Sequence, residues 1–311
     1  MRELMTWSMV VLTFFAFAGC SDSDSPIRPE THAGRPAEPL IVYVVNYPLQ
    51  YFAERIGGEH VKVVFPAPAD VDPAYWSPSA EIVAAYQQAD LILLNGAGYA
   101  GWVARASLPQ AAKVDTGAAF ADRLIPLESA VTHTHGPEGA HEHGAFAFTA
   151  WLDPTLAIEQ ARAVARAFEQ ARPAQAQTFR RSFDELTAEL TDLDRRLSAV
   201  AEKLGSEPLL FSHPVYQYLI RRYDLNGRSL HWETNAAPDL GELARALEDH
   251  PARWMVWEAE PLPETVEALN DAGIVSVVFA PCGRAPEAGD LMSEMERNLS
   301  RLEAGPGSSS R

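Results

Sequence analysis

Histidines are concentrated in one short polar segment of the chain. His133 and His135 are separated by one residue, as are His141 and His143, and Glu138 lies between the two pairs. Imidazole nitrogens are good ligands for zinc and copper, so four of them on one loop can chelate such an ion. The affinity is expected to be modest because the loop must be ordered at binding. The alternative is a solvated polar loop.

Three further candidate donors stand in the last third of the chain: His213, His231 and Cys282. His213 follows a predicted strand and opens a predicted helix, where a side chain either contacts a ligand or else caps the helix or packs in the core. Cys282 would complete a soft-donor site with the two histidines. The alternative is that its thiol is buried as a small apolar side chain.

Catalytic patterns are missing from the sequence. The carboxylates Glu258 and Glu260 follow a predicted strand, but they are not expected to work as an acid–base pair. No nucleophile motif, phosphate-binding glycine loop or catalytic zinc signature is present. We therefore expect a binding protein and not an enzyme.

The segments that must position these residues alternate between strands and helices. Apolar, β-branched runs predict strands over residues 40–45, 61–65, 90–94, 209–212, 228–232, 254–257 and 275–280. Capping residues and apolar spacing predict helices over residues 49–56, 79–89, 215–223, 239–248, 263–272 and 290–304. Ligands of such α/β units bind at the carboxyl ends of the strands, which makes the residues after each strand the first candidates.

Two long helices are predicted in the middle of the chain, over residues 156–172 and 174–204, with Pro173 between them. The second has apolar residues at a spacing of three to four over many turns. About 30 residues at about 1.5 Å each span about 45 Å, which is longer than one lobe is wide. The predicted fold class is therefore α/β, with two Rossmann-like lobes, a long rigid connecting helix and a ligand crevice between the lobes.

The N-terminal residues are typical of an exported lipoprotein. Arg2 precedes an apolar run that is too short to span a bilayer, and the run ends at Ala18-Gly19-Cys20. We expect a signal peptide and a lipid anchor on Cys20; the alternative is a secreted protein with an incidental cysteine. The expected division of the chain is 1–19 signal peptide, 20–38 lipidated cysteine and flexible tether, 39–172 N-terminal lobe with a His-rich loop at 132–144, 173–204 connecting helix, 205–304 C-terminal lobe and 305–311 disordered tail.

The formal net charge of −17 bears on the kind of partner. It disfavours nucleic acid, whose phosphates the mean field of the protein would repel, and it favours cations. Only Cys282 remains as a thiol once Cys20 carries lipid, so no internal disulfide is expected.

Several stretches together resemble one family of transport proteins. They are Val45-Asn46-Tyr47-Pro48-Leu49, residues 53–58, residues 89–98, Trp151-Leu152-Asp153-Pro154, and Ser212-His213 with Tyr216 and Tyr218. They resemble the zinc and manganese solute-binding proteins of ABC importers, the high-affinity zinc-uptake periplasmic binding proteins. The resemblance covers the chain from Pro39 to Leu302.

The resemblance implies a metal site between the lobes, built from three histidines and one acidic residue. Carried over position by position, the four places are Ala74, Thr149, His213 and Ala280. Only His213 is a metal ligand, and zinc needs about three or four donors. The expected metal site is therefore eroded.

The function implied by the resemblance is that of a substrate-binding lipoprotein of a metal import system. It would capture a divalent cation, with zinc expected and manganese as a second candidate, and deliver it to an ABC permease in the inner membrane. No organic cofactor is expected. The protein would stand in the periplasm or at the cell surface, attached to the membrane by its lipid.

The three replaced positions favour an alternative, in which a degenerate member of the family binds a non-metal ligand or a protein partner. Aromatic side chains mapped near the crevice by the resemblance offer faces for an organic ligand, or else pack the lobes together. The candidate crevice residues are Tyr75, Trp76, Thr149, Trp151 and Tyr216, with Trp232 nearby.

Overall fold

The computed structural model describes residues 38–127, 132–134, 140–142 and 145–305. The signal peptide, Cys20 and the tether lie outside the described residues, as do His135, His143 and the tail from residue 306. Within the described residues, no helix is long and apolar enough to cross a membrane.

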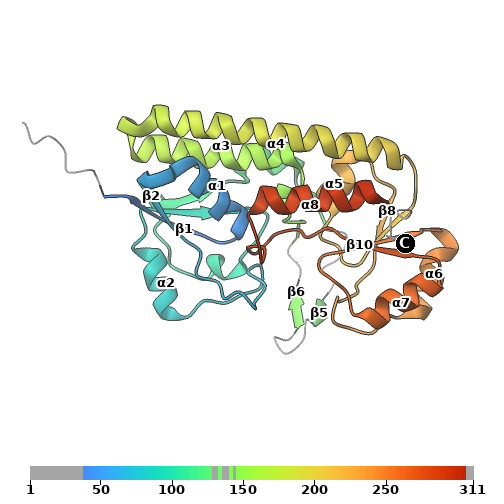
Figure 1. The fold of residues 1–311 in the computed structure, drawn as a ribbon. Helices are drawn as coiled ribbons and strands as arrows, with labels where there is room; N and C mark the ends of the chain where they lie inside the picture. The colour runs from blue at the N-terminus through green and yellow to red at the C-terminus, as the bar shows by residue number, and fades with distance from the viewer. Residues whose placement is uncertain (1–37, 128–131, 135–139, 143–144, 306–311) are drawn as a thin grey trace, which may run out of the picture. The chain divides into compact units, whose positions relative to one another are not determined.

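The first lobe is built on a parallel sheet with the strand order β2-β1-β3-β4 (Figure 1). Its strands are β1 (Leu40–Val44), β2 (Val61–Val64), β3 (Leu91–Leu94) and β4 (Lys113–Asp115). The helices α1 (Tyr47–Gly57) and α2 (Ala80–Gln87) follow β1 and β2. Asn46 begins α1, because its side chain accepts a hydrogen bond from the Leu49 N–H at 3.1 Å.

The second lobe repeats this plan with the strand order β10-β9-β7-β8, again all parallel. Its strands are β7 (Leu209–Phe211), β8 (Gly227–Ser229), β9 (Trp254–Trp257) and β10 (Val275–Val278). Its helices are α5 (Gln217–Tyr223), α6 (Leu240–Asp249), α7 (Pro263–Asp271) and α8 (Leu291–Ala304). The expected fold class, two parallel-sheet α/β lobes, is confirmed.

The helices α3 (Pro154–Ala171) and α4 (Ala176–Leu204) pack along each other, and α4 reaches elements of both lobes (Figure 1). Its buried side chains recur every three to four residues and face the core. Arg55 of α1 forms an ion pair with Glu189 at 2.6 Å, and Arg196 forms one with Glu296 of α8 at 2.6 Å. One apolar cluster contains buried residues of both lobes and of α4, so the connecting helix is part of the common core.

Three strands were not expected from the sequence. The edge strand β4 has only three residues of mixed polarity. The segment expected as a His-rich loop contains a short antiparallel hairpin, β5 (Thr132–Thr134) and β6 (Ala140–Glu142), in which His133 is the register partner of His141.

Candidate metal crevice

The carboxyl edge of the C-terminal sheet brings His213 and His231 together. His213 lies two residues after β7 and is 7% exposed, whereas His231 lies two residues after β8 and is exposed. Their ring centroids are 5.9 Å apart with the ring planes at 89°. A hydrogen bond from the Trp232 N–H to the Ser212 carbonyl, at 2.7 Å, holds the two strand ends side by side.

The other three positions implied by the resemblance carry no metal ligand. Ala74 and Ala280 end in methyl groups. The Thr149 hydroxyl donates a hydrogen bond of 2.5 Å to the Val215 carbonyl, so its proton is already used within the protein. Neither a methyl group nor a hydroxyl can stand in for the missing imidazoles and carboxylate. The residues present therefore do not form the four-donor shell of the family.

Three carboxyl groups interact electrostatically at the same edge of the sheet. The sequence did not indicate that they form a cluster. Burial, reinforced by the charges of Asp72 and Glu233, raises the pKa of Glu258 to about 8, and the Arg284 guanidinium opposes this shift. Burial, and then Asp72 and Glu258, also raise the pKa of Tyr75. Even with Glu258 protonated, two carboxylates act against one guanidinium here, which gives the crevice a negative potential.

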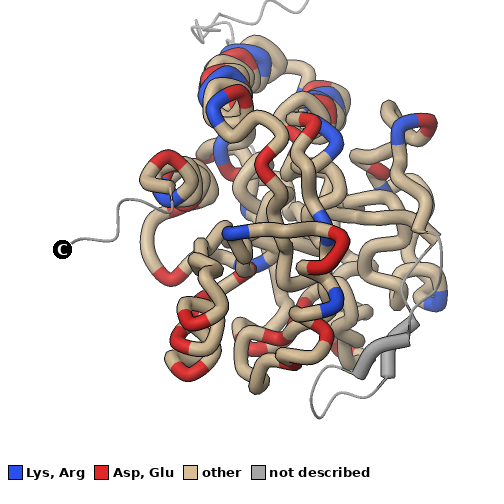
Figure 2. The backbone as a smooth tube through the Cα atoms, turned by 90° about the vertical axis from the view of Figure 1, so that its right-hand side faces the viewer, with Lys and Arg blue, Asp and Glu red and all other residues tan. Residues whose placement is uncertain are grey.

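The surrounding helices extend this negative potential. Figure 2 marks the acidic and basic residues along the backbone. From residue 239 to residue 271, the stretch that contains α6 and α7, the chain has nine acidic residues and only two arginines, Arg245 and Arg253. Such an excess raises the local concentration of cations.

The aromatic candidates contribute mainly to packing. Tyr216 is fully buried and its hydroxyl donates to the Phe279 carbonyl at 2.8 Å. Trp151 is buried and its indole N–H donates to the Pro281 carbonyl at 2.6 Å. Tyr75 packs edge-on against Phe148, with ring centroids 6.3 Å apart. Of these contacts, the hydrogen bond from Trp151 to Pro281 joins the two lobes, and the other two each lie within one lobe.

Two more aromatic candidates are placed differently. Trp76 is half-buried, and its backbone N–H donates to the Asp72 carbonyl at 3.0 Å. Trp232 is buried, and its indole N–H donates to Glu242 Oε2 at 2.7 Å, which ties the residue after His231 to α6.

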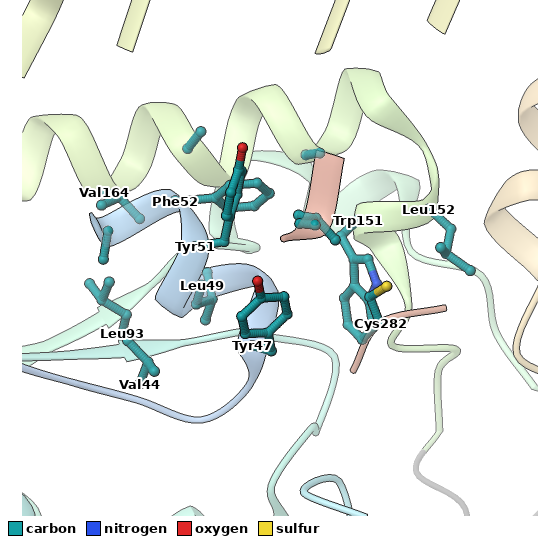
Figure 3. Close-up of a cluster of buried hydrophobic side chains, with 14 of the residues drawn as sticks. Val44, Tyr47, Leu49, Tyr51, Phe52, Leu93, Trp151, Leu152, Val164 and Cys282 are labelled. Carbon is teal, nitrogen blue, oxygen red and sulfur yellow. The ribbon is translucent and has the colours of Figure 1, made fainter. Parts of the chain in front are cut away.

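Cys282 belongs to the apolar core. It is 6% exposed, and it lies beside Trp151 in the cluster drawn in Figure 3. Burial, with a contribution from Glu294, raises the pKa of the thiol to about 12, which disfavours the thiolate that binds metals. This environment favours the alternative given in the sequence analysis, in which the thiol is buried as a small apolar side chain.

In the part of the chain that the structure describes, no three His, Cys, Asp or Glu side chains are already close enough together to hold a metal ion. The hairpin pairs His133 with His141 at the level of the backbone. His135 and His143 lie outside the described residues. The structure thus brings together two predicted donors, His213 and His231, while Glu258 follows β9, the neighbour of β7 on the side away from β8.

Comparison with known proteins decides the family. The family described as zinc-uptake complex component A, periplasmic, matches residues 42–305. The chain belongs to this family. The match includes both lobes, α3 and α4, as the resemblance of the sequence motifs implied.

Curated relatives match over most of the chain. The zinc-binding lipoprotein AdcA of Streptococcus pneumoniae (strain ATCC BAA-255 / R6) is 26% identical over 278 residues, covering 85% of this chain and 55% of that protein. The high-affinity zinc uptake system protein ZnuA of Bacillus subtilis (strain 168) is 26% identical over 270 residues, covering 81% of each chain. The chain therefore spans about half the length of AdcA.

Solved structures share the fold. The metal-dependent lipoprotein YcdH of Bacillus subtilis superimposes with a TM-score of 0.72 at 22% identity, over 85% of this chain and 98% of that chain. Zn(II)-bound AdcA of Streptococcus pneumoniae also gives a TM-score of 0.72, at 20% identity, over 85% of this chain and 57% of that chain. Both comparisons support the two-lobed architecture.

Proposed function

We propose that this protein is the substrate-binding component of an ABC import system for zinc. The observation that carries the proposal is the family match over residues 42–305, which spans both lobes and the helix between them. The named relatives AdcA and ZnuA are described as zinc-binding and as part of zinc uptake. The acidic crevice and the His213–His231 pair supply a potential and donors that suit a divalent cation.

The mode of action in this proposal is capture at the outer face of a membrane and delivery to a permease. A lipid on Cys20 would hold the protein there, and a tether up to residue 38 would let it reach its partner. Movement between the lobes is expected to be small, because α4 packs into the common core of both. No step of this action is catalytic.

Zinc binding by the full chain tests the proposal. Equilibrium dialysis against a competing chelator is expected to give one zinc ion per chain with a dissociation constant below about 1 μM. Manganese, tested in the same way, distinguishes the two candidate metals. Absence of stoichiometric binding of either metal at this level would overturn the proposal.

One observation favours a second function, in which the protein is a degenerate member of the family and binds a non-metal ligand or a protein partner. Thr149 stands where the resemblance implies a histidine, and its hydroxyl bonds the other lobe directly through Val215. Hydrogen bonds of this kind close the crevice without a metal. Under this second function the dialysis would show no zinc bound, and the fold would be unaffected by chelators.

A further inference from the structure

Three potential metal ligands occupy equivalent places on three neighbouring strands of the C-terminal sheet. Phe211 of β7 is the register partner of Ser229 in β8 and of Val256 in β9. Two residues beyond these partners stand His213, His231 and Glu258. Because the strands are parallel, all three residues emerge at the same carboxyl edge, with His213 in the middle.

The separation of the two imidazoles suits a shared ion. A zinc–nitrogen bond is about 2.0–2.1 Å, so the centroids of two rings that bind one tetrahedral ion lie about 5 Å apart. The observed 5.9 Å between His213 and His231 exceeds this separation by less than about 1 Å, which a small rotation of exposed His231 closes. Neighbouring strands are about 4.8 Å apart, so the flexible carboxylate of Glu258 starts one strand away from His213.

The charged side chains around Glu258 have a net negative charge, which favours the binding of a cation. Asp72 comes from the N-terminal lobe and Glu233 follows His231, and both carboxylates act on Glu258. Arg284 is the cation that acts on the group, and its guanidinium also donates to the Ala69 carbonyl at 2.8 Å. Even with Glu258 protonated, Asp72 and Glu233 outnumber the Arg284 guanidinium, and a divalent ion that displaced the proton of Glu258 would neutralise the group.

We propose that His213, His231 and Glu258 hold the transported cation in a site supplied by the C-terminal lobe. The inference rests on the proposed function for its ligand, but it assigns the ligands to a set other than the four positions implied by the family. Two imidazoles and one carboxylate are a zinc-type donor set, and they leave the fourth tetrahedral position to water. In the described structure the three side chains are not close enough to share an ion, so binding requires His231 and Glu258 to rotate toward His213.

Zinc affinity of single variants of the full chain tests the assignment. Each of His213→Ala, His231→Ala and Glu258→Gln is expected to weaken zinc binding about tenfold or more, since even partners outside the ligand shell contribute 10- to 100-fold. Glu260→Gln makes the same chemical change at an exposed residue two positions further on. His60→Ala removes an imidazole that packs against Phe179. His60 directly precedes β2, so it lies at the amino end of the N-terminal sheet, away from the carboxyl edge that faces the proposed site. Both control variants are expected to keep the affinity of the unmodified chain.

Zinc X-ray absorption of the unmodified chain gives a reading that does not depend on the folding of a variant. The proposed site predicts two imidazoles, further oxygen ligands and no sulfur in the first shell. A sulfur ligand, or four imidazoles, would overturn the assignment.

The remaining outcomes separate this inference from the proposed function. If only the double variant His133→Ala/His141→Ala loses zinc, the hairpin is the binding site; the inference fails and the proposed function stands. If His213→Ala loses zinc while His231→Ala and Glu258→Gln retain it, the inference fails in the same way. If the unmodified chain binds no zinc, the proposed function itself fails.

Discussion

Asn298 of α8 binds both backbone polar groups of Ala280. Its Oδ1 accepts from the Ala280 N–H at 2.9 Å, and its amide nitrogen donates to the Ala280 carbonyl at 2.9 Å. Asn298 is fully buried. The backbone of the position where the family resemblance implies an acidic ligand is thus held firmly, although the side chain is only a methyl group.

Replacement of this asparagine is expected to cost stability. Asn298→Ala removes two hydrogen bonds and leaves the polar groups of residue 280 without these partners, so the free energy of unfolding should fall by about 2 to 3 kcal/mol. Urea denaturation measures the loss. Asn226→Ala is the matched control, because Asn226 is exposed and donates a single 3.0 Å bond to the Ser206 carbonyl. Equal losses in the two variants would contradict the role given to Asn298.

The hydroxyl of Thr149 is expected to stabilise the contact between the lobes. Thr149→Val keeps the shape of the side chain but removes the hydrogen bond to the Val215 carbonyl, at a cost of about 1 to 3 kcal/mol. Thr191→Val is the control: the Thr191 hydroxyl bonds the Thr187 carbonyl on the exposed side of α4, and its loss should cost much less. Denaturation midpoints compare the two.

Zinc affinity gives a second reading of the same variant. Since Thr149 is not among the three ligands proposed, Thr149→Val should bind zinc as tightly as the unmodified chain. A large loss of affinity with unchanged stability would instead place Thr149 in the metal site.

The elements with the clearest local signals were predictable from the sequence. The strand expected over residues 254–257 coincides with β9, a continuous run of buried side chains. The helix expected from residue 156 begins slightly earlier, at Pro154, because the Asp153 carboxylate accepts a hydrogen bond from the Thr155 N–H at 2.9 Å. In both cases the information lies within the segment itself.

The elements that depend on distant partners were not predictable in this way. The strand β4 has only three residues and exists through its pairing with β3. The nearness of His213, His231 and Glu258 depends on the register of three strands that lie far apart in the sequence. The sequence indicates that each of these residues follows a strand. It does not indicate which strands are neighbours in the sheet.

The carboxyl group of Glu258 should make the stability of the zinc-free protein depend on pH. Its pKa is about 8 in the folded protein against an ordinary value of 4.5, so the folded state retains a proton that the unfolded state has lost between these values. The free energy of unfolding should therefore fall as the pH rises through this window. Glu258→Gln is expected to reduce this fall, so that the variant is the more stable protein near pH 8 to 9 but not near pH 4 to 5.

Thermal midpoints measured across this range, in the presence of a chelator, provide the measurement. Glu260→Gln is the control, because it makes the same chemical change at an exposed side chain two positions away. Parallel profiles for Glu258→Gln and the unmodified chain would show that the Asp72–Glu233–Glu258 group does not carry a retained proton.

The thiol of Cys282 should be unreactive in the folded protein. It is buried beside Trp151, its sulfur lies 3.7 Å from the Ala280 carbonyl oxygen, and its pKa is about 12, so little thiolate forms near neutral pH. A disulfide reagent should label Cys282 only after denaturation, and zinc should not change the labelling rate of the folded chain. Rapid labelling that zinc suppresses would identify the sulfur as a ligand, and would replace Glu258 by Cys282 in the site on β7 and β8.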